Sequence, residues 1–168
     1  MLPLRTTVEV LESREVPALT FFQDAGNVVG DVSDTVNQFR SILGTLNPNT
    51  AGSFGTGRRE INWDGVPDEL AAPNALPGDF FAARGAVLST RGDHVAVSAD
   101  ADNPDGAAVR FGDLNDGYPD EFRTFSKERL FSPVGSNVAT IRFYVPGTDT
   151  PAGVRGFGAV YTLSLIHI

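Results

Sequence analysis

The sequence predicts a mainly β protein, an antiparallel β-sandwich preceded by one amphipathic helix. Short segments in which apolar and polar residues alternate recur over the C-terminal two thirds of the chain, as expected of half-buried strands. The 18 Gly and 11 Pro follow no repeating period and supply turns between short strands. Twelve Phe, three Tyr and one Trp provide bulky core material, and 168 residues suit a single domain.

Both ends of the chain are expected to lie outside this domain. Residues 1–18 contain the motif LESREVPA at 11–18, which resembles the LESRxVPA segment near the N-terminus of predicted extracellular proteins of planctomycete bacteria. The resemblance implies a sorting segment. Residues 163–168, LSLIHI, resemble the translation of a transposase adapter. We therefore expect a non-native tail that stands in place of further natural sequence.

One helix is predicted over residues 33–43, inside a region, 19–57, that otherwise has the composition of a linker. Ser33 is its expected N-cap, because its hydroxyl can accept a hydrogen bond from the first turn. The apolar positions at helical spacing are Val36, Phe39 and Leu43. They predict a helix face that packs on a core rather than one that binds a cofactor.

The β-sandwich is predicted for residues 58–162. Its candidate strands are the segments 59–63, 85–90, 94–98, 109–111, 130–132, 138–145 and 154–162. The segment 138–145 has the strongest β propensity, because Val, Ile and aromatic residues alternate along it. Residues 91–93 predict a plain hairpin turn. Gly156 and Gly158 indicate close packing or a bulge in the last strand.

The composition restricts the classes of function. A net charge of −8 opposes nucleic-acid binding, which requires basic surfaces against phosphate. The sequence contains no apolar run of about 18 residues, so we expect no membrane span in this chain. Cysteine is absent, which removes Cys nucleophiles, Cys-based zinc sites and iron–sulfur clusters.

Three motifs resemble a family of secreted bacterial proteins that has no assigned activity. They are GRREINWDGVPD at 57–68, FSKERLFSPVGSN at 125–137 and FYVPGT at 143–148. The resemblance implies an extracellular or cell-surface location. The layout is also similar to jelly-roll modules, many of which bind carbohydrate, so a jelly-roll-like sandwich is expected. Family members continue beyond the position of Thr162, which implies an incomplete sandwich with an open sheet edge and a tendency to aggregate or to fold poorly.

Asn62, Trp63 and Asp64 form the most site-like cluster in the sequence. A Trp ring can stack on the face of a sugar while Asn and Asp side chains bond its hydroxyl groups. In the alternative interpretation, the Trp packs inward and the two polar side chains cap a turn. The structural interpretation is favoured, because a single Trp in a strand usually belongs to the core.

Asp100, Asp102 and Asp105 resemble a calcium loop, since hard cations bind closely spaced oxygen ligands. The spacing departs from the EF-hand pattern, because Pro104 takes the third ligand position and no Glu stands at the twelfth. Solvated Asx turns are the favoured alternative. Calcium is therefore the one cofactor that the sequence suggests.

No catalytic residue is predicted. His94 is the one histidine outside the predicted tail, and no nucleophile motif accompanies it. We expect a non-catalytic, structural or adhesive module of a larger secreted protein, with carbohydrate or other surface proteins as partners. The alternative is a carbohydrate-binding module, with or without calcium. A hydrolase fragment is a more remote possibility, because the sequence does not fix the separation of any carboxylate pair.

Overall fold

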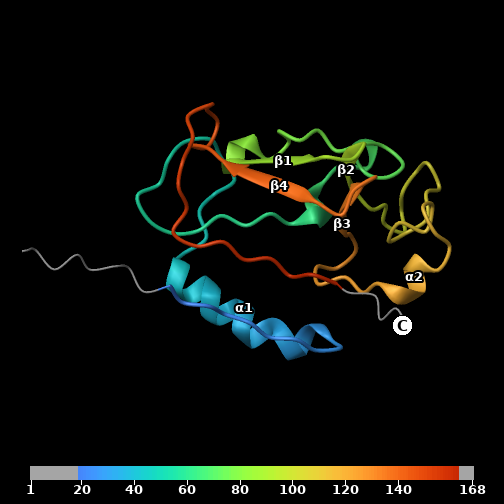
Figure 1. Cartoon of the computed structure of the whole chain (residues 1–168), viewed down its shortest axis with the longest axis horizontal. Coiled ribbons are helices and arrows are strands. Elements are labelled where there is room, and N and C mark those ends of the chain that lie inside the picture. Colours follow the sequence, from blue (N-terminus) through green and yellow to red (C-terminus); the bar gives the residue numbers. More distant parts are fainter. Residues whose placement is uncertain (1–18, 163–168) are drawn as a thin grey trace, which may run out of the picture.

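The computed structural model describes residues 19–162, so the predicted sorting segment and the predicted tail lie outside the described residues. The described part contains two α-helices, three short 3₁₀ helices and four antiparallel strands in two small sheets (Figure 1). Long irregular segments connect these elements. The prediction of a mainly β, helix-poor chain is confirmed at this level. Neither described helix has the length and hydropathy needed to cross a bilayer.

Helix α1 spans Val29–Leu43 and begins before the predicted start at Ser33. The carboxylate of Asp31 accepts hydrogen bonds from the backbone N–H groups of Asn27 and Val28, at 2.8 and 3.2 Å. Ser33 lies inside the helix, where its hydroxyl donates to the Val29 carbonyl at 2.7 Å. The predicted N-cap was wrong because an acidic side chain in the first turn can fix the entry of the chain from within the helix.

Four of the predicted strands are confirmed. Strand β1 (Ala86–Thr90) pairs antiparallel with β4 (Ala139–Phe143), and β2 (His94–Val97) pairs antiparallel with β3 (Phe131–Val134). The second α-helix, α2 (Tyr118–Glu121), is short and lies in the connection between β2 and β3. The pairing is nested, since the β2–β3 pair lies between β1 and β4 in the sequence.

The predicted hairpin at residues 91–93 is wrong. Strands β1 and β2 follow each other in the chain but belong to different sheets. The connection between them is therefore a corner from one sheet to the other. Turn residues show that the chain reverses locally, but they do not show which strands form hydrogen bonds with each other.

The three other predicted strands are not formed. Residues 109–111 contribute only an isolated bridge, between Val109 and Ala99. Residues 59–63 lead into a 3₁₀ turn at Trp63–Gly65. Residues 154–162 form no strand and run beside α1 (Figure 1). A Cβ atom on Gly158 would lie 2.8 Å from the Phe39 ring, so the glycine permits this close approach. The close packing predicted for Gly158 is confirmed, but it is packing against the helix.

Both sheets contribute to the main core. Its buried members are Val66, Leu76, Phe81, Ala86, Leu88, Val95 and Val97. Strand β1 alternates between buried and half-buried residues at its start, whereas three consecutive residues of β2 are buried. Trp63 and Phe131 pack against this core from one side. The core therefore fixes the position of the 3₁₀ turn that carries the predicted site residues.

Candidate functional site

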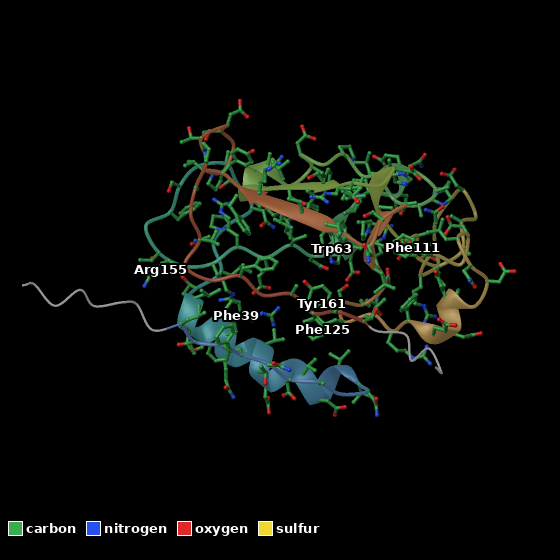
Figure 2. The ribbon with its side chains drawn as sticks, viewed as in Figure 1. Phe39, Trp63, Phe111, Phe125, Arg155 and Tyr161 are labelled. Carbon is green, nitrogen blue, oxygen red and sulfur yellow. The ribbon has the colours of Figure 1, made fainter. Side chains whose placement is uncertain are left out.

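A cleft of about 350 Å³ lies between α1, the segment 60–64 and the segment 125–127. Its lining residues are Arg40, Glu60, Ile61, Asn62, Asp64, Phe125, Ser126 and Lys127. Two of the three predicted ligand residues, Asn62 and Asp64, are among them. Figure 2 shows Phe125 on the side of the molecule that faces α1, whereas Trp63 lies closer to the sheets.

The indole of Trp63 is part of an aromatic cluster at the core. It stacks on the Phe131 ring with centroids 4.6 Å apart and an interplanar angle of 15°. The Phe81 ring contacts it edge-on at 5.6 Å. One face of the indole is thus covered by β3, and that face is not available to a sugar. Asn62 is exposed, and its side-chain oxygen caps the 3₁₀ turn by accepting from the Asp64 N–H at 3.2 Å.

The carboxylate of Asp64 binds the segment that precedes β3. Its Oδ1 atom accepts from the Ser126 hydroxyl at 3.0 Å and from the N–H groups of Glu128 and Arg129 at 3.2 and 2.9 Å. Its Oδ2 atom accepts from the Lys127 N–H at 2.9 Å. Burial raises the pKa of Asp64, but these hydrogen bonds outweigh it and bring the pKa below its ordinary value. The acceptor sites of this carboxylate therefore serve the fold.

A cluster of one carboxylate and two guanidinium groups joins α1 to the domain. Glu60 accepts from Nε and Nη2 of Arg40, each at 2.9 Å, and from Nε of Arg58 at 2.6 Å. Arg58 also donates to the carbonyl of Gly44, just beyond α1. Burial raises the pKa of Glu60, whereas Arg58 and Arg40 lower it by more, so the pKa lies below its ordinary value.

Replacing Glu60 by Gln is expected to weaken the docking of α1. The side chains of Arg40 and Glu60 are each about one-third exposed, so we expect the free energy of unfolding to fall by only ~1 kcal/mol. Because the folded pKa of Glu60 is lowered, its contribution exists near neutral pH and disappears as the pH falls through that pKa. Amide hydrogen exchange in α1 at neutral and acidic pH measures how far Glu60 stabilises the docked helix. Glu69→Gln, at an exposed position, is the control; equal exchange in both variants would contradict the role of Glu60.

The three predicted calcium ligands are not brought together. Asp100 Oδ2 accepts from Nε and Nη2 of Arg129 at 3.1 and 2.5 Å, whereas Asp102 and Asp105 are exposed. Within residues 19–162, no group of three or more His, Asp or Glu side chains could hold a metal ion. Instead, a guanidinium group neutralises Asp100, and the Asn103 side chain accepts from the Asp105 N–H at 3.0 Å, as in the favoured Asx-turn interpretation. Calcium binding itself stays a prediction.

Arg129 is the residue that sequence reasoning missed most completely. It is only 3% exposed, and Nη2 binds Asp68 as well as Asp100. Burial lowers its pKa, but the two carboxylates raise it by more, so Arg129 stays charged. In the sequence it stands in an ordinary polar stretch, Lys127 to Arg129. No local signal shows that its partners lie far away in the chain.

Comparison with protein-family models, with curated proteins and with solved structures finds no match for this chain. The cleft combines an aromatic ring, Phe125, with exposed polar groups such as Asn62 and Lys127. The half-buried carboxylates of Asp64 and Glu60 already accept hydrogen bonds from other residues of the protein. Such a cleft can contact a neutral polar ligand.

Proposed function

We propose that the chain is a non-catalytic extracellular or cell-surface β module, structural or adhesive, of a larger secreted bacterial protein. The observation that carries this proposal is that the ionisable groups in and near the cleft bind other parts of the same protein. Asp64, Glu60 and Arg129 each bind backbone or charged groups of other segments. Charges that hold a scaffold together favour a module that presents a surface over one that performs acid–base chemistry.

The same proposal includes the finer architecture. Two antiparallel sheets that share one core are what a small jelly-roll-like β-sandwich requires. The nested pairing of β2–β3 within β1–β4 supports this assignment. In antiparallel sandwiches, strands that lie far apart in the sequence often pair within one sheet.

Exposed apolar side chains support an adhesive role. Several of them belong to α1, its flanks and the C-terminal segment beside it: Val28, Val29, Ile42, Val154, Phe157, Val160 and Tyr161. Tyr161 is 77% exposed and Ile42 is 67% exposed. Apolar side chains gathered on neighbouring elements favour contact with another protein. Other surface proteins are therefore the proposed partners.

A carbohydrate-binding module is the second candidate, and the cleft favours it. Phe125 would replace Trp63 as the aromatic surface, while Asn62 and Lys127 would bond hydroxyl groups. In the calcium-assisted version of this candidate, an ion would be held near Asp100, Asp102 and Asp105. That version requires the exposed carboxylates to move toward each other on binding.

Retention of bacterial cell envelopes on beads coated with the protein separates the two candidates. An adhesive module is expected to retain envelopes whose glycans have been oxidised and to lose envelopes treated with protease. A carbohydrate-binding module gives the opposite result, and Phe125→Ala then abolishes retention; a calcium-assisted module also loses it in chelator. Hydrolysis of chromogenic glycosides by the wild type that fails in Asp64→Asn would overturn the non-catalytic proposal.

A further inference from the structure

The four strands differ in how their outer edges are protected. Strand β1 is covered on the side away from β4, where Leu88 donates its N–H to the Gly78 carbonyl at 2.7 Å. Strand β2 is covered on the side away from β3, where the Val95 carbonyl accepts from the Leu76 N–H at 2.9 Å. Open edges are templates for pairing with another chain.

Proline protects the edge of β3. Pro133 lies opposite Val95, whose carbonyl points away from β3 toward Leu76. Opposite residues of an antiparallel pair share the same orientation, so the nitrogen of Pro133 also points outward. A proline at that position offers no N–H group to an incoming strand.

Strand β4 has no such protection over its first three residues. Ile141 lies opposite Leu88, whose N–H points away from β4, so the N–H and C=O groups of Ile141 point outward as well. Ala139, opposite Thr90, has the same orientation. Within residues 19–162, no hydrogen bond reaches the outward N–H group of either residue.

The chain itself begins to cover this edge and then leaves it. After β4 it turns back, and Ala152 donates its N–H to the Phe143 carbonyl at 3.0 Å. Tyr144 and Pro151 form an isolated antiparallel bridge. Continued in this register, residue 154 would lie opposite Ile141. The segment instead runs along α1, where Gly156 and Gly158 contact Phe39, and the edge at Ala139–Ile141 stays open.

We propose that this edge pairs with the same edge of a second copy of the chain. Antiparallel pairing of two β4 strands about a two-fold axis at Thr140 would join Ala139 of each copy to Ile141 of the other, forming a continuous four-stranded sheet. The register suits the side chains. Thr140 would face Thr140, a favourable cross-strand pair, and the exposed Arg142 would face Val138 rather than another charge. The inference does not depend on the function proposed above.

The absence of native cysteine permits a direct test. In the proposed register, the two Thr140 positions form a non-hydrogen-bonded pair with Cα atoms about 4.5 Å apart, within the range that a disulfide can bridge. We expect Thr140→Cys to form disulfide-linked dimers at least about tenfold faster than Ser89→Cys under mild oxidation, because pairing raises the effective concentration of the thiols. Ser89 is the matched control, since it lies opposite Thr140 on β1, one strand further from the axis.

A second measurement does not depend on the cysteine variants. Wild-type protein is expected to show concentration-dependent dimerisation by analytical ultracentrifugation, and Ala139→Pro should weaken it about fivefold or more by removing an outward N–H group while leaving the β1 pairing intact. Circular dichroism melting confirms that each variant is folded. A wild type that stays monomeric at all concentrations overturns the proposal. Cross-linking of Thr140→Cys no faster than that of Ser89→Cys also overturns it.

Discussion

Replacing Arg129 by Met is expected to lower the free energy of unfolding by about 3–5 kcal/mol. Arg129 is 3% exposed, and the side chain of Asp100 that it binds is only 15% exposed. Methionine fills much of the same volume but leaves the Asp100 carboxylate in the interior without its partner. An unpaired buried charge costs more than the lost ion pair itself. Urea-induced unfolding, followed by circular dichroism, measures the difference.

Two companion variants test whether the loss of stability comes from the Asp100 carboxylate that is left without a partner. Arg155→Met removes an exposed guanidinium group and is expected to leave stability nearly unchanged. The double variant Arg129→Met with Asp100→Asn should recover part of the loss, because the charge that lacked a partner is gone. A single Arg129→Met variant as stable as the wild type would show that the buried ion pair is not needed to hold these segments.

Replacing Asp64 by Ala is expected to lower the free energy of unfolding by about 2–3 kcal/mol. Four donors from the segment before β3 lose their acceptor, among them the N–H groups of Lys127, Glu128 and Arg129. Hydrogen bonds to a charged group are stronger than those between neutral groups. The exposed Asp116→Ala is the matched control and should have little effect.

The effect of Asp64 has a defined dependence on pH. Its folded pKa lies below the ordinary value of 3.8, so the carboxylate stabilises the fold above that value. The stabilisation is lost as the pH falls through the folded pKa, because the group is then protonated in both states. The difference in unfolding free energy between the wild type and Asp64→Ala should therefore be full at pH 7 and shrink below about pH 4. A difference that grows on acidification would contradict this account.

Local patterns in the sequence were sufficient to place several elements. The alternation of Val, Ile and aromatic residues placed β4, and the helical spacing of Phe39 and Leu43 placed α1. The start of α1 was missed because the side chain that fixes the entry of the chain, Asp31, lies inside the helix and accepts from Asn27 and Val28 just before it. Patterns over a few residues report local backbone conformation, and they are most reliable in the middle of an element.

Partners distant in the sequence could not be predicted. Asp64 was singled out, but its four donors lie about 60 positions away, and nothing in either segment identifies the other. Likewise, alternation in residues 154–162 predicted a strand, whereas glycines in that segment allow closer packing on Phe39. The choice between pairing with β4 and packing on α1 depends on tertiary contacts, which a single sequence does not contain.

The central claim is that the polar residues beside the cleft hold the scaffold together, and amide hydrogen exchange tests it most directly. In the wild type, the N–H groups of Lys127, Glu128 and Arg129 are predicted to exchange slowly because Asp64 accepts from all three. In Asp64→Ala they should exchange rapidly, while the amides of β2 stay protected. Rapid exchange of these three amides in the wild type, or unchanged protection in the variant, would contradict the claim.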